Sequence, residues 1–176
     1  LNIPNYQRNY TWEKKQVEEL FDDFINHAAF VESLEDETSS SRQNEIPKYY
    51  LGQVVLVVDG NNLNLLDGQQ RLTTLYILNS VLSFRYRQLR PLIEQNNSLT
   101  DTEKVLWLAE IDGTENSQGI LTILKGLRFG TGNLSWLQIK YHNDKAHFNH
   151  VISDSFNPNS NLPEGLSKTH GIFKAF

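Results

Sequence analysis

The sequence predicts an α+β fold, because helical and strand patterns occupy separate stretches of the chain. Residues 49–66 contain two apolar runs with a turn between them, which is the pattern of a β-hairpin. Stretches on either side repeat apolar residues at helical spacing. With 176 residues and 39% hydrophobic content, the chain can bury one substantial core. We therefore expect a single domain.

The N-terminal region predicts an extended segment followed by a helix. Pro4 fixes its own backbone dihedral and disfavours helix at the residue before it, so residues 2–9 should be extended. Thr11 is the expected N-cap of a helix over residues 13–30. The apolar residues of this helix recur at helical spacing and should face the core: Val17, Leu20, Phe21, Phe24 and Ala28. Residues 32–45 are acidic and polar, which predicts a mobile loop.

The predicted hairpin leads directly into a second helix. Residues 49–58 and 63–66 form its strands, and residues 59–62, reading Asp-Gly-Asn-Asn, supply the turn. Apolar residues then keep the helical period over residues 71–88. Pro91 should end this helix, because proline lacks the backbone N–H that the helix needs.

The chain after Pro91 predicts shorter elements. Thr100 and Glu103 offer a capping box for a helix to about Ile111. Residues 112–119 should be loop. Residues 118–127 are ambiguous between helix and strand, because their β-branched residues and their leucine spacing favour different structures.

The C-terminal quarter predicts one strand and two helices. Residues 136–141 have strand character, and Asn143 or Asp144 should cap the helix that follows. The apolar residues expected on that helix are Phe148, Val151 and Ile152. Residues 155–165 predict a loop, and residues 166–176 predict the beginning of a further helix.

Composition excludes several classes of protein. The absence of Cys removes disulfides, thiolate metal sites and cysteine nucleophiles. No apolar run approaches ~20 residues, and no charged and apolar leader precedes the first motif, so we expect neither a membrane span nor a signal peptide. A cytoplasmic location fits this composition. Because the chain contains no Met, we expect a fragment excised from a longer protein.

Charge argues against a domain that coats DNA by electrostatics alone, because the net charge is −5. Local basic clusters occur at Arg85, Arg87 and Arg90, and at Lys14 and Lys15. We favour solvated helix surfaces for both clusters over a nucleic-acid face. The pair His147 and His150 lacks an evident acidic third ligand, so no metal site is predicted.

Residues 67–71, reading Asp-Gly-Gln-Gln-Arg, are the best candidates for chemistry. They lie where a strand gives way to a helix, and a helix N-terminus attracts phosphate through its unpaired N–H groups and its dipole. Gly68 permits close approach of the backbone, and Arg71 can bind phosphate oxygens in a bidentate manner. Asp67 is a candidate to hold Mg²⁺ on a nucleotide or to orient a water. Gln69 and Gln70 are candidates to position that water or to bond phosphates.

Thr73 and Thr74 follow this motif and are further candidates to bind phosphate or a metal-bound water. The alternative is a simple Asp-Gly turn with a capping Asp67, in which both threonines are ordinary first-turn residues. From spacing alone, this alternative is favoured.

A second polar and aromatic cluster opens the chain. Tyr6, Gln7 and Arg8 follow a rigid proline and are candidates to project into a pocket, where Arg8 would meet a phosphate and the aromatic rings a base or a modified backbone. Alternatively, Tyr10 and Trp12 are hydrophobic anchors for the first helix, which is the favoured role for Trp12.

Residues 3–12, 50–52 and 67–75 together resemble the N-terminal domain shared by GmrSD-type modification-dependent restriction proteins and their phosphorothioate-sensing relatives. Weaker likeness continues at residues 143–148 and 167–176. The resemblance implies a ParB- and sulfiredoxin-like α+β fold, with a small mixed sheet and flanking helices, that binds and hydrolyses a nucleoside triphosphate with Mg²⁺.

The resemblance also implies a division of the chain and of the site. Residues 1–90 would hold the nucleotide-binding core motifs, and residues 91–176 the remainder of the domain and the start of a helical part. Gly68 and Arg71 fall on the element that cradles phosphates, and Asp67, Gln69 and Gln70 complete the catalytic set. Thr73 and Thr74 join the nucleotide site, and Tyr6, Gln7 and Arg8 are assigned to sensing of DNA or another ligand.

The function implied is a nucleoside triphosphatase and sensor module of a bacterial anti-phage restriction system, with modified DNA as its further partner. The family's usual C-terminal HNH-type nuclease domain is not found in these residues, so DNA cutting is not expected of them. The alternative is a non-catalytic DNA or protein recognition module with the same fold.

Overall fold

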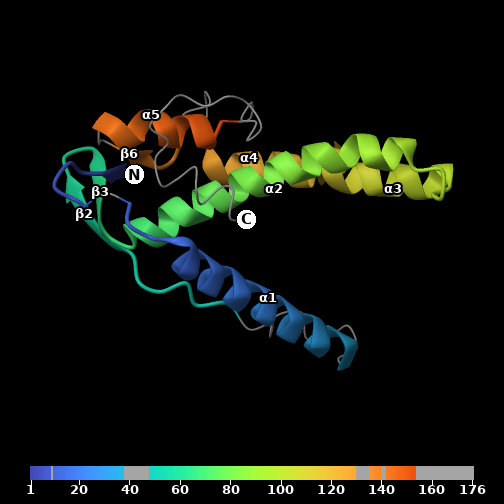
Figure 1. Ribbon diagram of the computed structural model, residues 1–176, viewed down its shortest axis with the longest axis horizontal. Helices are drawn as coiled ribbons and strands as arrows, with labels where there is room; N and C mark the ends of the chain where they lie inside the picture. The colour runs from blue at the N-terminus through green and yellow to red at the C-terminus, as the bar shows by residue number, and fades with distance from the viewer. Residues whose placement is uncertain (9, 38–47, 130–134, 140–141, 154–176) are drawn as a thin grey trace.

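A computed structural model of the chain confirms the α+β class. It describes residues 1–8, 10–37, 48–129, 135–139 and 142–153. A small sheet lies at the N-terminal end of the long helix α2. Helix α5 packs against this sheet, whereas α1 and α3 extend away from it (Figure 1). The loop predicted over residues 38–45, and the elements predicted over residues 155–176, lie outside the described residues.

The predicted hairpin is confirmed. β2 (Val55–Asp59) pairs antiparallel with β3 (Asn62–Asp67), with the turn at the Gly and Asn residues between them. The prediction that the first strand begins at residue 49 is wrong, because β2 begins at Val55 and the preceding residues are not in a strand. Residues 48–54 instead pass beside the start of α2, where they contribute to the candidate site described below.

The chain's first residues complete the sheet. β1 (Asn2–Ile3) lies parallel between β3 and β6 (Gln138–Ile139), which gives the strand order β2-β3-β1-β6 among the described strands. The prediction that residues 2–9 are extended throughout is wrong, because the chain turns after β1 and the Gln7 N–H donates to the Pro4 carbonyl at 3.1 Å. This turn directs the following residues toward α2.

The first helix, α1 (Lys14–Glu37), is longer than predicted, so residues 32–37 are helix rather than loop. It begins after Glu13, whose backbone N–H donates to Gln16 Oε1 at 3.0 Å, and Thr11 is therefore not its cap. Only the early part of its apolar stripe is core, because Val17 and Leu20 are buried whereas Phe21 and Ala28 are exposed. Figure 1 shows the reason: α1 diverges from α2 along its length.

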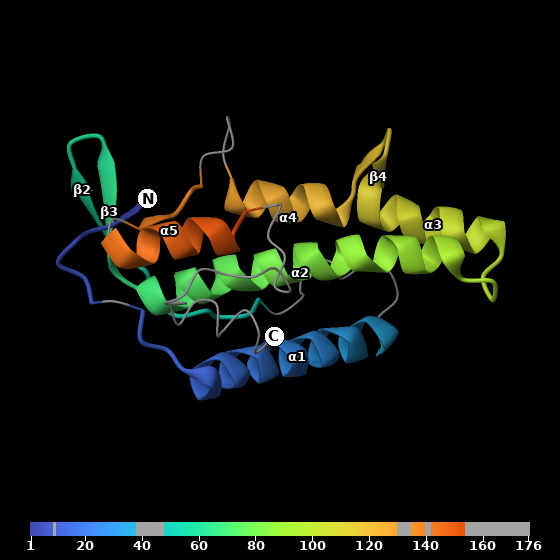
Figure 2. The ribbon, with the colours of Figure 1, turned by 45° about the horizontal axis from the view of Figure 1, so that its top comes forward.

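Pro91 does not end the second helix, contrary to the prediction. α2 (Gln69–Gln95) continues past it and packs against α3 (Asp101–Asp112) and α4 (Ile120–Arg128), which lie along one side of it (Figure 2). Proline removes one backbone hydrogen bond there, while Arg90 Nε donates to Asp112 Oδ2 at 2.8 Å and holds the same turn against α3. Packing and this ion pair offset the lost bond.

The remaining elements agree in part with the predictions. The capping box of Thr100 and Glu103 is confirmed at the start of α3. The predicted loop over residues 112–119 contains a short hairpin of β4 (Gly113–Thr114) and β5 (Ser117–Gln118), and the ambiguous segment after it is helix α4.

The last described helix, α5 (His142–Val151), starts before the residues that were expected to cap it. Asn143 and Asp144 therefore lie inside it. Its predicted apolar residues are buried, as is the residue that follows it: Phe148, Val151 and Ile152. No helix within the described ranges combines the length and the apolar character required to cross a membrane.

The described core consists of two clusters of buried residues. The first joins α1, α2 and α5 through Tyr10, Val17, Ile77, Val81 and Val151. The second covers the sheet with α5 through Ile3, Leu65, Leu137, Ile139, Phe148 and Ile152. Buried Arg128 links α4 to α2 and to the end of α5, since its guanidinium donates to Ser80 and Ser83 hydroxyls at 3.1 and 3.0 Å and to the Ile152 carbonyl at 3.1 Å.

A buried pair of hydroxyl groups fixes α2 against the segment before α1. Thr74 Oγ1 donates to the Gln70 carbonyl at 2.8 Å, so it accepts from the Tyr10 hydroxyl, whose oxygen lies 2.6 Å away. Burial raises the pKa of Tyr10, which therefore remains a neutral donor at physiological pH. Thr73 is equally buried, but its hydroxyl has no hydrogen-bond partner among the described residues.

These neighbouring threonines should respond differently to the same substitution. Thr74→Val should lower the free energy of unfolding by about 1–3 kcal/mol, because it leaves the Tyr10 hydroxyl buried without its acceptor. Thr73→Val should be neutral or stabilising, because no hydrogen bond is lost and a buried polar group is removed. Urea unfolding of the two variants measures both effects, and equal losses at the two positions would contradict this bonding pattern.

Candidate functional site

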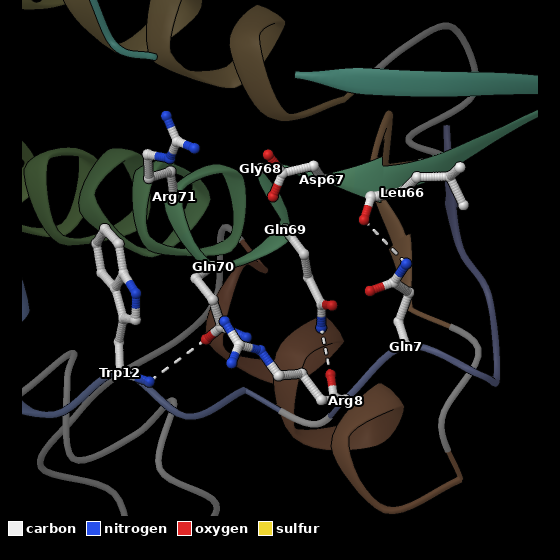
Figure 3. A pocket seen from close by; sticks show the side chains of 9 residues that line it. All are labelled: Gln7, Arg8, Trp12, Leu66, Asp67, Gly68, Gln69, Gln70 and Arg71. Carbon is white, nitrogen blue, oxygen red and sulfur yellow. Dashed lines mark hydrogen bonds between the residues drawn. The ribbon is translucent and has the colours of Figure 1, made fainter. Parts of the chain in front are cut away.

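A cavity of about 210 Å³, partly open to solvent, lies at the N-terminal end of α2 and brings together the two clusters that the sequence singled out. Its walls come from the segment before α1, from the end of β3 and from the first turn of α2 (Figure 3). The lining residues are Gln7, Arg8, Trp12, Leu66, Asp67, Gly68, Gln69, Gln70 and Arg71.

Gly68 makes the transition from strand to helix possible. It is the N-cap of α2 and has a φ of 90°, a conformation that glycine adopts without strain. A Cβ at this position would lie 3.1 Å from Val54 Cγ2 and 3.3 Å from the Gln53 carbonyl oxygen, so space is also restricted. The first backbone bond of the helix runs from the Leu72 N–H to the Gly68 carbonyl at 3.0 Å, and Gly68 provides no side-chain cap. The positive end of the helix dipole thus lies at the cavity wall.

The two glutamines of the motif hold the segment that crosses the cavity, residues 7, 8 and 10–12, which we call the strap. Gln69 Nε2 donates to the Arg8 carbonyl at 2.9 Å. Gln70 Oε1 accepts from the backbone N–H groups of Thr11 and Trp12 at 2.8 and 3.3 Å. Both glutamine side chains are buried, and their amides point toward the strap (Figure 3). The Gln69 amide nitrogen and the Gln70 amide oxygen thus both bond the strap.

Gln7 closes one end of the cavity by the same type of contact. Its Nε2 donates to the Leu66 carbonyl at 3.0 Å, which ties the strap to the last part of β3. The strap is therefore bonded through side-chain amides to both the strand and the helix that form the cavity.

Arg71 extends to the other side of α2 (Figure 3). Its NH1 group donates to the Leu51 carbonyl at 2.8 Å. Gly52, with a φ of 96°, lies directly beside the guanidinium, and a Cβ there would collide with it. The role of residues 51 and 52 was missed by the sequence analysis, where they entered only through the resemblance. A glycine just before a strand was the available signal.

Asp67 is an exposed carboxylate at the end of β3, and within the described part of the chain it has no hydrogen bond or ion pair. Arg8 is exposed on the strap side of the cavity. The cavity thus combines one carboxylate, two guanidinium groups and a helix N-terminus. This combination can bind a phosphate group and an associated cation.

Three predicted site residues do not line the cavity. Thr73 and Thr74 are fully buried inside α2, and Thr74 is bonded to Tyr10. Tyr6 is 69% exposed and lies outside the lining set. Trp12, favoured from the sequence as a helix anchor, has two contacts: it packs against the first core cluster and it lines the cavity. Among the described residues, no group of His, Asp and Glu forms a metal site.

Comparison with known protein families finds one match over nearly the whole chain. Residues 1–172 match the family described as GmrSD restriction endonuclease, N-terminal domain. This range contains the strap, the hairpin and the first turn of α2 that form the cavity. The comparison with curated proteins finds no match.

Gly52→Ala should destabilise the protein more than Gly60→Ala. Both glycines have positive φ, so each substitution costs about 1–2 kcal/mol of backbone strain. At Gly60 a Cβ meets nothing within 4 Å, whereas at Gly52 it displaces Arg71 from the Leu51 carbonyl. That displacement should add about 1.5–3 kcal/mol, the typical contribution of a hydrogen bond to a charged group.

A double-mutant cycle with Arg71→Ala isolates this contact. In the Gly52→Ala background, Arg71→Ala should cost little further stability, because the guanidinium has already lost its place. Thermal and urea unfolding provide the values. Purely additive losses would show that Gly52 does not act through Arg71.

Replacing each motif glutamine with glutamate tests whether its side chain donates a hydrogen bond to the strap or accepts one from it. Gln69→Glu removes the donor to the Arg8 carbonyl and faces one acceptor with another, whereas Gln70→Glu retains an acceptor for the strap N–H groups. We expect Gln69→Glu to destabilise by about 1–3 kcal/mol more than Gln70→Glu at neutral pH.

The difference should depend on pH with a defined sign. A glutamate at position 69 has a raised pKa in the folded state, since only its protonated form can donate to the Arg8 carbonyl. Its protonated form stabilises the fold at low pH, and that stability is lost as the pH rises through the raised pKa. Urea unfolding at neutral and at acidic pH measures this effect. If Gln69→Glu lowered the free energy of unfolding equally at both pH values, the assignment of donor and acceptor would be rejected.

Proposed function

Because this chain belongs to the GmrSD restriction endonuclease N-terminal domain family, we propose that it is the nucleotide-dependent sensor domain of an anti-phage restriction protein. In this proposal the domain binds a nucleoside triphosphate in the cavity and hydrolyses it. One observation carries the proposal: Arg71, Arg8 and Asp67 all line the cavity that lies at the N-terminus of α2.

The cationic groups and the helix N-terminus support phosphate as the bound group. A helix N-terminus attracts anions through its backbone N–H groups and its dipole. Arg71 is positioned by one bond to the Leu51 carbonyl, and its remaining N–H groups are available for phosphate oxygens. Arg71 would then stabilise the negative charge that develops on phosphate oxygens during hydrolysis.

The carboxylate supports a magnesium ion that arrives with the nucleotide. Mg²⁺ is commonly held by one or two carboxylates together with substrate phosphates and waters, rather than by a cage of protein ligands. Asp67 fits this pattern because it is exposed at the cavity and bonded to nothing else that the structure describes. A bound Mg²⁺ would neutralise phosphate charge. Asp67 would hold that ion or orient the attacking water.

Gln69 and Gln70 have a positioning role in this proposal. Their amides hold the strap, so they fix Arg8 relative to the phosphate site through the Arg8 and Trp12 backbone. Binding at the start of α2 would then be transmitted to the strap and to the exposed Tyr6. We assign recognition of modified DNA to the strap side, at Tyr6, Gln7 and Arg8.

A non-catalytic recognition module is the second candidate function. It is favoured because both motif glutamines bond the strap and so have a structural role. Among the residues that line the cavity, Asp67 is then the remaining candidate to activate a water. This alternative predicts binding of modified DNA, with its usual salt dependence, that does not change when a nucleotide is added.

Asp67→Asn should reduce Mg²⁺-dependent release of phosphate from ATP by at least ~100-fold, a typical effect of removing a group that acts on the reacting water or its metal ion. Folding should be unaffected, because this carboxylate makes no structural contact in the described residues. A colorimetric phosphate assay and a thermal unfolding curve measure the two quantities. Asp59→Asn, at the other end of the same hairpin, is the matched control and should retain full activity.

The assay also separates the two candidate functions. Phosphate release that is equal in Asp67→Asn and in the unsubstituted protein would refute the assigned role of Asp67. If the unsubstituted protein releases no phosphate yet binds modified DNA independently of nucleotide, the recognition module is correct and hydrolysis is excluded.

A further inference from the structure

Trp12 is the aromatic residue among those that line the cavity, and the proposed phosphate site does not use it. We propose that its indole ring is the stacking surface for the nucleotide base, and that the site therefore accepts several bases. This inference rests on the proposed nucleotide binding. It names the part of the site that contacts the base and the class of substrate that follows.

Contacts within the protein hold Trp12 in place. The Trp12 backbone N–H donates to Gln70 Oε1, so its position is tied to the first turn of α2. The half-buried side chain packs against the first core cluster and also lines the cavity. A rigid aromatic surface binds a planar ligand without the entropic cost of ordering a mobile side chain.

The size of the cavity places the base at this ring. Its volume of about 210 Å³ is below the roughly 300–1,000 Å³ of pockets that enclose a whole drug-sized ligand. The cavity can therefore enclose the phosphate end of a nucleotide while the remainder extends outward. Gln7 and Leu66 are bonded to each other at one end, and Trp12, whose backbone N–H is bonded to Gln70, lies at the other end (Figure 3). The base then extends toward Trp12.

Stacking implies weak discrimination between bases. Every nucleobase presents a π-face, so a stacking surface tolerates different bases and binds them with similar strength. The amide oxygen of Gln70, which is bonded to the Trp12 backbone, already accepts from two N–H groups of the strap. We therefore expect purine and pyrimidine triphosphates to be substrates, with affinities within about tenfold of one another.

Intrinsic fluorescence tests the assignment, because the chain has three Trp residues. Trp107 is exposed on α3 and Trp136 is exposed near the end of α4, so the variant Trp107→Phe/Trp136→Phe leaves Trp12 as the reporter. Titration with Mg-ATP, Mg-GTP, Mg-CTP and Mg-UTP should quench its emission in each case. Inorganic tripolyphosphate, which has no base, should bind roughly 5- to 150-fold more weakly and cause little quenching.

A substitution at Trp12 itself provides the second measurement. Calorimetry should show that Trp12→Leu lowers ATP affinity to that of tripolyphosphate, without changing the affinity for tripolyphosphate. Trp12→Phe keeps an aromatic ring and should retain most of the ATP affinity. Should Trp12→Leu fail to fold, the fluorescence titration and the Trp12→Phe variant still decide the question.

The outcomes distinguish this inference from the proposed function. Equal affinity for ATP and tripolyphosphate, with unchanged Trp12 emission, would overturn the stacking role and leave phosphate binding intact. A preference for one base by much more than tenfold would overturn the predicted tolerance. Absence of binding by any of these compounds would overturn both the inference and the proposed nucleotide site.

Discussion

Three polar side chains in the first turn of α2, of which Gln69 and Gln70 are buried, hold the site together. Gln69 and Gln70 bond the strap on one side, and Arg71 bonds the Leu51 carbonyl on the other. Each glutamine bond contributes about 1 kcal/mol and the bond from charged Arg71 about 1.5–3 kcal/mol, while a buried amide left without its partner costs about 1–3 kcal/mol. The strap and residues 51–52 are therefore fixed relative to the helix N-terminus, and the cavity depends on all three contacts.

Because of this arrangement, the position of a polar residue in the motif does not reveal whether its role is structural or chemical. Neighbouring residues point in different directions, since successive positions on a helix lie about 100° apart. Gln70 and Arg71 consequently contact opposite segments although they are adjacent. Asp67, which precedes the helix, is exposed at the cavity with no structural bond in the described residues. The proposed chemistry is therefore assigned to residues that the fold leaves accessible.

The sequence predicted the parts of the fold that depend on local physics. The hairpin and the capping box of α3 follow from turn and cap residues, and both are confirmed. The end predicted at Pro91 was wrong because packing against α3 overrides a local rule. The strand-to-helix setting of Gly68 was predictable, but the partners of Gln69 and Gln70 depend on tertiary contacts with a distant segment, which spacing does not encode. Trp12 shows the same limit, because one residue serves both core and cavity.

Local rather than net charge determines which anions this domain can bind. The basic cluster predicted near the end of α2 is partly neutralised: Arg90 contacts Asp112 at 2.8 Å and Glu94 at 3.5 Å, and the bond to Asp112 raises its pKa. At the other end of the same helix, Arg71 is instead bonded to the Leu51 carbonyl. Because a carbonyl carries no net charge, this contact does not neutralise the positive charge of Arg71. With a net charge of −5, the protein repels a polyanion at long range, so the proposed binding of phosphate would depend on this short-range site. The N-terminal end of α2 is accordingly where our proposal places the phosphate-bearing ligand.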